Sequence, residues 1–355
     1  MPVPPRIVSM RDIAAKAGVS HATVSMALRD APGVSVARRE EIRRLAEDMG
    51  YRPDPLLQQL AAYRRSRRET RIESCIAWLN DWEPAGNYHK YREYACYWEG
   101  ARAGAESLGY RLEEFLLRKQ SPGPERLLRM LRARGIRGVL IPPHRTVFGY
   151  AECDWGGFSV VKIGFSVPAL RTHLVTSDQY AGGGLAARRM LGAGHRRISL
   201  VGTSILERHT RGNFTAAFLR VRDQAVPPAA RIPPLFLEKE DAAARKQFSL
   251  WLKKHRPTAL LFSPSWLPSW IKELGLAVPD DIALGAISML DGLPVDSGLD
   301  QFPVEVGRAA VELLASLVGT RDFGIPEHPR CLLIEPRWAS GTTLPEPCAA
   351  RRQKK

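Results

Sequence analysis

Short apolar runs alternate with segments of helical periodicity along most of the chain after residue 72. The apolar runs that predict strands are 76–80, 138–143, 160–165, 198–202, 259–263, 282–288 and 331–335. The predicted helices lie near 90–107, 124–134, 180–192, 212–223, 241–254 and 304–318. Continuous apolar runs separated by helices indicate parallel strands that are covered on both faces. The pattern therefore predicts a doubly wound α/β architecture, and the number of strands fits two lobes better than one.

A different pattern occupies residues 9–50, where three short helices are predicted. Their capping residues are Ser9, Ser20 and Ser35, and the residues that separate or end them are Gly18, Pro32, Gly33 and Gly50. Two helices joined by a tight glycine-containing turn, with a third helix closing the core, form a helix-turn-helix unit. Such a unit places its second helix in the major groove of DNA. A three-helix bundle without a ligand is the alternative that this pattern leaves open.

The sequence motifs of both regions resemble one known family. Residues 9–30, SMRDIAAKAGVSHATVSMALRD, and residues 34–54 are similar to the DNA-binding head of LacI/GalR transcriptional regulators, whose D-[IV]-A-x-x-A-G-V-S-x-x-T-V-S core is matched from Asp12 to Ser25. Segments 177–202, 278–288 and 299–318 resemble the core domain of these regulators, which shares the fold of periplasmic sugar-binding proteins. The resemblance implies a repressor that binds a two-fold symmetric DNA operator as a homodimer, under control of a small-molecule effector.

The second helix, expected from Ser20 to Arg29, carries the predicted base contacts. The residues of the head expected to contact DNA are Ser9, Ser20, His21, Ala22, Thr23, Ser25, Met26 and Arg29. His21 can hydrogen-bond a base edge, and Ala22 can only meet a thymine methyl group. Many family members have arginine where this chain has Met26, so the half-site is expected to lack that guanine contact.

Residues 53–62, PDPLLQQLAA, predict a short hinge helix, with Asp54 as its cap. A helix of about eight residues is marginal alone. By resemblance it orders when two subunits lie on the operator, and Leu60 is then a wedge in the minor groove. Burial of Leu60 in a core is the alternative. Arg64 and Arg65 belong to a basic linker that is expected to touch phosphates.

The resemblance also implies an effector crevice at the carboxyl ends of the strands. Its expected contacts are Trp82, Asp178, Gln179, Arg208, Arg211, Trp266, Ser288 and Gln301. The family's usual polar contacts are replaced or moved at Thr210, at Pro264 and at Ser288. These departures argue against a standard hexose as the effector, which is expected to be another sugar or a nucleoside. The sequence leaves open whether the effector induces or co-represses. The tryptophans can pack on a ligand face or join the lobes.

Composition narrows the class of protein. A net charge of +15 favours a polyanionic partner such as DNA. Five scattered cysteines in no CxxC pair predict neither disulfides nor a metal site. Without a nucleotide-binding or hydrolase motif, neither an enzyme nor a cofactor is expected, and His195 is interpreted as structural. With no apolar membrane or signal segment, we expect a cytoplasmic, nucleoid-associated protein, and an effector-independent architectural DNA-binding protein is the main alternative.

The predicted organisation has four parts. Residues 1–52 form the head, residues 53–71 form the hinge helix and linker, residues 72–345 form the two-lobed effector-binding and dimerisation domain, and residues 346–355 form a basic tail. The first lobe is expected at about 72–175 plus 304–328, and the second at about 176–303 plus 329–345.

Overall fold

The computed structural model describes residues 8–28, 33–51, 74–82, 91–117, 124–144, 150–289 and 292–346. The chain divides into two compact units, Met1–Thr70 and Arg71–Lys355. We call the first unit the head and the second the body, and each is described by itself.

The head contains the three helices that the sequence predicts: α1 (Met10–Ala17), α2 (His21–Leu28) and α3 (Val36–Asp48). Ser9 and Asp12 form a complete capping box at the start of α1, and Gly18 ends that helix in the left-handed conformation. The core consists of Ile13, Ala14, Val24, Ala27, Ile42 and Ala46. The helix-turn-helix architecture is therefore confirmed. Helix α2 is described as far as Leu28, and Arg29 lies outside the described residues.

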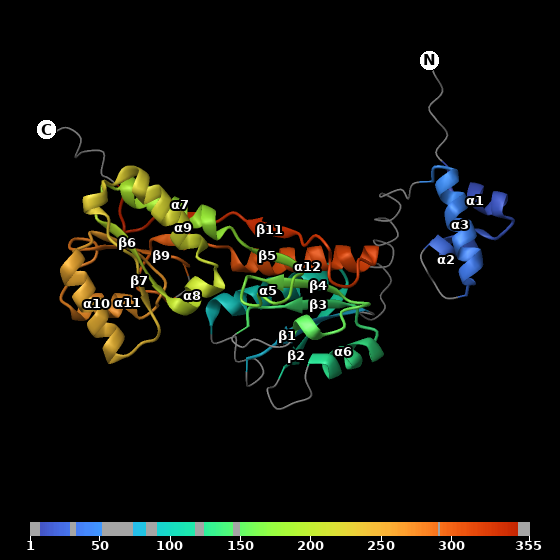
Figure 1. The fold of residues 1–355 in the computed structure, drawn as a ribbon, viewed down its shortest axis with the longest axis horizontal. Coiled ribbons are helices and arrows are strands. Elements are labelled where there is room, and N and C mark those ends of the chain that lie inside the picture. Colours follow the sequence, from blue (N-terminus) through green and yellow to red (C-terminus); the bar gives the residue numbers. More distant parts are fainter. Residues whose placement is uncertain are drawn as a thin grey trace, which may run out of the picture. The chain divides into compact units, whose positions relative to one another are not determined.

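The body contains two six-stranded sheets, one in each lobe (Figure 1). The first has the order β11-β5-β4-β3-β1-β2, and the second has the order β12-β10-β9-β8-β6-β7. The strands of the first are β1 (Ser74–Asn80), β2 (Tyr110–Leu116), β3 (Gly138–Ile141), β4 (Ser159–Ile163), β5 (His173–Ser177) and β11 (Cys331–Ile334). Those of the second are β6 (Ile198–Thr203), β7 (Leu235–Leu237), β8 (Ala259–Phe262), β9 (Ala283–Ala286), β10 (Gly298–Asp300) and β12 (Arg337–Ala339). All pairings are parallel except β10 with β12.

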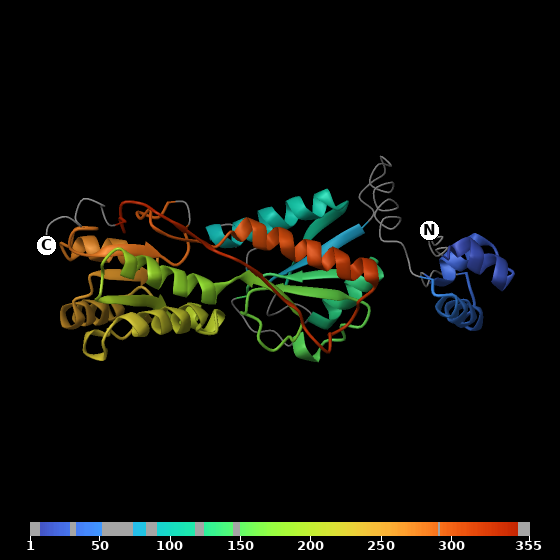
Figure 2. The ribbon, with the colours of Figure 1, turned by 90° about the horizontal axis from the view of Figure 1, so that it is seen from above.

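Helices cover both faces of each sheet (Figure 2). In the first lobe, α5 (Arg92–Ser107) and α12 (Pro303–Thr320) cover one face, and α6 (Pro124–Ala133) covers the other. In the second lobe, α7 (Gln179–Gly192) and α9 (Asn213–Ala225) lie opposite α10 (Ala242–His255) and α11 (Leu267–Glu273). Three short helices complete the description: η2 (Tyr150–Glu152), α8 (Ser204–His209) and η3 (Pro228–Ala230). The doubly wound prediction is confirmed.

One expected boundary between the lobes differs from the structure. The sequence analysis assigned residues 329–345 to the second lobe, but β11 pairs in parallel with β5 from Cys331 to Ile334. That segment therefore belongs to the first sheet, and the chain enters the second lobe only after Ile334. The apolar run alone could not distinguish the two sheets, because each has an edge beside which such a strand can pair.

Helices α5 and α12 touch backbone to backbone at two glycines. A Cβ atom on Gly100 would lie 1.8 Å from the carbonyl oxygen of Val304, and one on Gly307 would lie 2.1 Å from the carbonyl oxygen of Tyr97. Only glycine permits this separation, because any side chain would overlap the facing backbone. The packing of the first lobe depends on this close crossing.

We predict that Gly100→Ala lowers the free energy of unfolding by about 1–3 kcal/mol, because the helices must separate to admit a methyl group. Gly319→Ala, in the same helix pair, is the matched control: an added Cβ meets nothing within 4 Å, so the change should be neutral or stabilising. Urea unfolding of both variants measures the difference. Equal stabilities would contradict the crossing geometry.

Asp296 holds the segment that follows β12 against the second lobe. Its carboxylate accepts hydrogen bonds from the backbone N–H groups of Thr342 and Thr343, at 2.7 and 2.8 Å, and from both threonine hydroxyls. Desolvation opposes ionisation, but these donors outweigh it and hold the pKa of Asp296 well below its usual value. The ionised carboxylate is therefore part of the folded structure.

We predict that Asp296→Asn lowers the free energy of unfolding at neutral pH. Because the folded pKa lies below the unfolded one, the stabilisation is fully present above the unfolded pKa of about 4 and disappears as the pH falls through the folded pKa. Chemical denaturation between pH 7 and pH 2.5 should therefore show a difference between wild type and variant that narrows with acid. A constant difference would exclude the ionised carboxylate as its cause.

Candidate DNA interface and effector crevice

The start of α2 is held by a local cap that leaves its first residues accessible. Ser20 Oγ accepts the backbone N–H of Thr23 at 3.1 Å, and the two hydroxyls lie 2.8 Å apart. His21 and Ala22 are exposed immediately after this cap. Two of the predicted base-contacting residues therefore stand at the exposed end of the helix.

The other expected contacts of the head differ in exposure. Ser9 caps α1, and Ser25 and Met26 are half-buried. The sulfur of Met26 lies 3.9 Å from where a Cβ on Gly33 would stand, which places Met26 toward the turn before α3. Of the other five, Thr23 belongs to the cap of α2. The remaining four lie outside the described residues: Arg29, Leu60, Arg64 and Arg65.

Arg38 of α3 bonds to the end of α1, and these two helices support α2. Its guanidinium donates to the carbonyl oxygen of Ala17 at the end of α1, at 2.6 Å, and to Glu41, also at 2.6 Å. The first contact satisfies a terminal helix carbonyl with a positive charge. It ties the end of α1 to α3, so the turn that leads into α2 is fixed from both sides.

The carboxyl ends of the strands carry a second group of polar residues, in the body. In the first lobe, Asp81 follows β1, and its carboxylate lies 3.8 Å from Nδ1 of His144, which follows β3. The other ring nitrogen of His144 lies 2.5 Å from the hydroxyl of Tyr150. Burial lowers the pKa of His144, which Asp81 partly offsets. Burial, with Arg208 nearby, lowers the pKa of His209 of α8 in the second lobe, which Asp81 partly offsets.

Gln301 joins the two lobes at the same level. Its carbonyl oxygen accepts the hydroxyl of Ser177 at 2.5 Å, and its amide donates to the carbonyl of Ile287 at 3.0 Å. Ser177 ends β5 of the first sheet, whereas Ile287 follows β9 of the second. Both functional atoms of Gln301 are therefore engaged within the protein, and the expected pocket residue serves as a connector.

Three buried polar atoms near this connector have no hydrogen-bond partner among the described residues: Gln179 Oε1, Ser263 Oγ and Ser288 Oγ. Gln179 lies two residues after Ser177, and Ser288 directly follows Ile287. Ser263 directly follows the neighbouring strand β8, whose last residue, Phe262, accepts a hydrogen bond from the backbone N–H of Ile287. Buried polar groups are costly when unsatisfied, so such a group of atoms indicates a site that a polar molecule completes.

A cation–π contact joins an arginine of the second lobe to an aromatic ring of the first. The guanidinium of Arg211 lies 4.7 Å from the ring centre of Phe165, which follows β4 of the first lobe. The loop that carries Phe165 is held by Lys162, whose ammonium donates to the carbonyls of Val167 and Leu170 at 2.9 and 2.6 Å. Burial, with Arg211 nearby, lowers the pKa of Lys162 to about 8. Arg208, by contrast, is exposed.

The remaining predicted crevice residues are engaged in packing or capping. Trp82 is 5% exposed, its indole N–H donates to the carbonyl of Pro143 at 3.1 Å, and its ring lies against Tyr91 and Tyr94. Trp266 packs on Trp270 with 4.1 Å between ring centres. These contacts favour the packing alternative for both tryptophans.

Asp178 accepts the backbone N–H of Ala181 and so caps α7. Thr210, at the position where an arginine was expected, bonds back to the carbonyl of Leu206. The sequence analysis missed Ser263, Phe165, His144 and His209, although Ser263 and Phe165 stand where predicted strands end, and that position was the available signal.

We predict opposite effects for two serines. Ser288→Ala removes a buried hydroxyl without a partner among the described residues, so the ligand-free protein should become more stable by about 1 kcal/mol. Ser177→Ala, the matched control, deprives Gln301 of its donor and should cost about 1–3 kcal/mol. Urea unfolding measures both. A loss of stability in Ser288→Ala would show that its hydroxyl is satisfied within the fold.

Comparisons with known proteins identify both regions of the chain. Residues 9–54 match the family "Bacterial regulatory proteins, lacI family", and residues 187–343 match the periplasmic binding protein-like domain. The HTH-type transcriptional repressor PurR of Escherichia coli is 23% identical over an alignment of 299 residues, and the match covers 78% of this chain and 79% of that protein.

Solved structures share the fold. The lac repressor dimer bound to operator and the anti-inducer ONPF is 17% identical, with a TM-score of 0.58 over 96% of this chain and all of that one. A complex of the transcriptional regulator CelR with cellobiose is 18% identical, with a TM-score of 0.57 over 95% of this chain and 99% of that one.

A LacI family regulator from Enterococcus faecium with bound ribose is 16% identical, with a TM-score of 0.55 over 77% of this chain and 99% of that one. Within the described ranges, no helix is long and apolar enough to cross a membrane. The helix-turn-helix head, the two-lobed body and the matches to both domains lead to one conclusion: the chain belongs to the LacI/GalR family of DNA-binding transcriptional regulators.

Proposed function

We propose that this regulator is a repressor that binds a two-fold symmetric operator as a homodimer and responds to a small polar effector held between its lobes. The observation that carries the effector part is the group of unsatisfied atoms on Gln179, Ser263 and Ser288. The DNA part rests on the exposed start of α2, on the net charge of +15 and on the match of residues 9–54 to lacI family regulators.

The head supplies sequence recognition in this proposal. His21 and Ala22 meet base edges in the major groove, and Ser9, Ser20 and Thr23 lie at helix starts that approach phosphates. Met26 in place of arginine gives up a bidentate guanine contact, which is worth about 1–3 kcal/mol of discrimination. One head buries little DNA surface, so two heads on successive turns account for specific binding.

The segment after the head connects recognition to the body. In this proposal, residues 53–62 supply the hinge helix, with Leu60 as a minor-groove wedge, and the basic side chains of Arg64 and Arg65 add contacts to phosphates. These residues lie outside the described part of the chain, so this step rests on the sequence. Effector binding changes the angle between the lobes and thereby the spacing of the paired hinge helices. Coupling of this kind is typically about 1–3 kcal/mol.

The chemistry of the crevice defines the effector as a molecule with several hydrogen-bonding groups. Gln179 Oε1 requires a donor, whereas the hydroxyls of Ser263 and Ser288 can donate or accept. A sugar or a nucleoside offers such groups, and two of the structural relatives hold cellobiose and ribose. An architectural protein without an effector has no need for buried unsatisfied polar atoms. The relatives are regulators, which supports a role without catalysis.

Selection of bound sequences from random duplex DNA, with and without pooled cell metabolites, tests this function. We expect a palindromic consensus whose enrichment changes when the effector is present. Single half-sites bound by monomers would contradict the dimer, and enrichment unchanged by any metabolite would favour the architectural alternative.

We predict that His21→Ala raises the dissociation constant for the selected operator by about 5- to 100-fold and leaves affinity for unrelated DNA nearly unchanged, because His21 contacts base edges and not phosphates. Arg44→Ala on α3 serves as the comparison, since loss of an exposed charge should affect both DNAs alike. Fluorescence anisotropy at fixed salt provides the constants. If His21→Ala loses affinity equally for both DNAs, sequence recognition does not depend on the start of α2.

A further inference from the structure

The amino-terminal edge of the second sheet brings two basic loops side by side. One loop, residues 195–197, precedes β6, and the other, residues 253–256, forms the last turn and the cap of α10. The guanidinium of Arg197 donates to the carbonyl of Arg256 at 2.9 Å, and the carbonyl of Arg197 accepts the backbone N–H of Thr258 at 2.8 Å. These bonds join two segments that are far apart in the sequence, and we call the result the distal basic surface.

Most of the excess positive charge of the chain belongs to the body. Residues 1–70 contain 13 basic and 8 acidic side chains, which leaves 39 basic and 29 acidic side chains for residues 71–355. Within the described residues, five cations of the distal basic surface form no ion pair with a carboxylate. They are Arg196, Arg197, Lys253, Lys254 and Arg256, of which Arg197 is half-buried and the other four are exposed.

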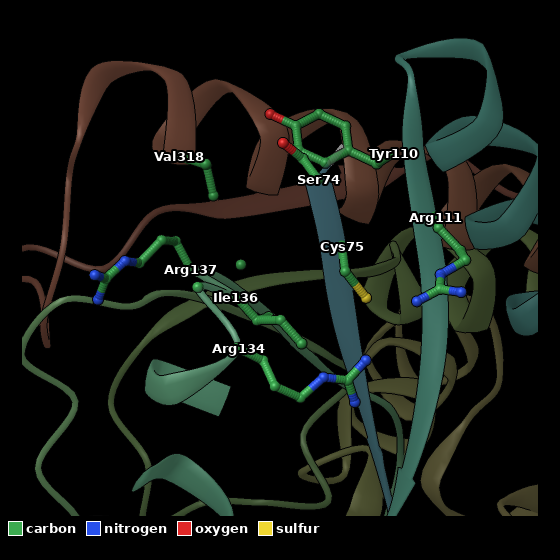
Figure 3. Close-up of a pocket in the computed structure, with 10 residues that line it drawn as sticks. Ser74, Cys75, Tyr110, Arg111, Arg134, Ile136, Arg137 and Val318 are labelled. Carbon is green, nitrogen blue, oxygen red and sulfur yellow. The ribbon is translucent and has the colours of Figure 1, made fainter. Parts of the chain in front are cut away.

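The corresponding edge of the first sheet neutralises its arginines. Figure 3 shows the side chains of Arg111 and Arg134 pointing toward one another at that edge. Glu113 accepts hydrogen bonds from both, at 2.7 and 2.8 Å from Arg134 and at 2.9 Å from Arg111. In the part of the chain that the structure describes, no carboxylate has this role at the distal basic surface.

The electrostatic field at the distal basic surface is positive. Burial, followed by the charges of Lys254 and Arg197, lowers the pKa of His255. Asp280 and Asp281 precede the neighbouring strand β9, but two carboxylates do not balance five cations. An uncompensated cluster of like charges disfavours the folded chain and attracts a polyanion.

Arg256 has a backbone conformation that favours glycine. It caps α10 with a φ of 43°, in the left-handed region, where glycine is the usual cap because it has no Cβ atom. Its guanidinium forms neither a hydrogen bond nor an ion pair within the described residues. The side chain therefore adds conformational strain that no contact inside the body offsets, which points to a contact outside it.

The distal basic surface lies at one extreme of the body. Strands β5 and β10 end where the chain crosses between the lobes, so the carboxyl ends of the parallel strands face the junction in both sheets. Their amino ends point away from the junction. Figure 1 accordingly shows α10 at the outer end of the second lobe. The surface is therefore separate from the effector crevice.

We propose that the distal basic surface binds the phosphate backbone of duplex DNA, as a contact separate from the helix-turn-helix head. Lys253, Lys254 and Arg256 supply charged donors whose side chains have no partner within the described residues. Contacts of this kind release counterions and read no base sequence. DNA is favoured over other polyanions because the head already brings it to this protein at high local concentration.

Lysine acetylation of the full chain, with and without a short duplex of unrelated sequence, locates the contact. The duplex should slow acetylation of Lys253 and Lys254 severalfold. Lys239 and Lys246 are exposed residues of the same lobe outside the surface, and their acetylation should not change. Peptide mass spectrometry resolves the sites. Protection confined to Lys16 of the head would overturn the proposal.

A double variant measures the contribution of the surface to affinity for unrelated DNA. Lys253→Gln combined with Lys254→Gln should raise the dissociation constant severalfold and reduce the slope of its logarithm against that of the salt concentration by about 1–2. Arg126→Gln removes an exposed cation of the first lobe and should change neither quantity. Fluorescence anisotropy at several salt concentrations gives both. An unchanged slope in the double variant contradicts the proposal.

Arg256→Gly separates DNA binding from folding. Glycine relieves the left-handed backbone, so the midpoint of urea unfolding should stay the same or rise. Affinity for unrelated DNA should nevertheless fall severalfold, because a phosphate contact is lost. Unchanged affinity would show that the guanidinium of Arg256 does not contact DNA.

Polyglutamate tests the other class of partner. At matched charge concentration, it should protect Lys253 and Lys254 from acetylation less than the duplex does. Equal or stronger protection by polyglutamate would assign the distal basic surface to an acidic protein and overturn the proposal for DNA.

Discussion

The amide of Gln301 links the two lobes at their buried junction. It accepts from Ser177, at the end of one sheet, and donates to the carbonyl of Ile287, at the end of a strand of the other. A single side chain thereby satisfies two polar groups that would otherwise be buried without partners. The neighbouring atoms of Gln179 and Ser288 have no partner among the described residues. The junction that holds the lobes together therefore lies beside the atoms available to a ligand.

This proximity explains how a small molecule can influence the geometry of the body. Gln179 begins α7 and Ser288 follows β9, so both atoms belong to the second lobe, beside the residue that connects it to the first. The cation–π contact between Arg211 and Phe165 also spans from one lobe to the other. Interactions that differ between open and closed lobes are what allow binding to shift a conformational equilibrium.

Much of the fold could be predicted from sequence because its central strands are continuous apolar runs. The strands that were missed are different in kind. Strand β2 lies at an edge and is half-exposed, and β7, β10 and β12 have three residues each, too few to show a period. Strand β5 begins with His173 and ends with polar residues. Their burial is made possible by partners distant in sequence, such as the backbone N–H of Arg330, which donates to His173.

The candidate sites also differ in how far the sequence could predict them. The start of α2 could be predicted because a cap and its helix are local, and the structure confirms the cap at Ser20. In the crevice, the position of a residue after a strand was predictable, but its use was not. Trp82 and Gln301 both stand where a ligand contact was expected, yet their polar atoms bond to the protein itself. Whether a side chain is already satisfied depends on tertiary neighbours, which a single sequence does not contain.

The chain passes from the first lobe to the second after β11, and this passage affects how the lobes can move relative to each other. Three chain segments run between the lobes, and they are bonded sideways: the N–H of Asp178 donates to the carbonyl of Ile334, and Asp300 pairs with Arg337. Figure 2 shows the segment after β11 running lengthwise from one lobe to the other. Segments joined side by side can bend together, but the hydrogen bonds between them resist a twist of one lobe against the other. Relative movement of the two lobes is therefore restricted to bending about one axis, so the direction in which one lobe moves against the other is defined.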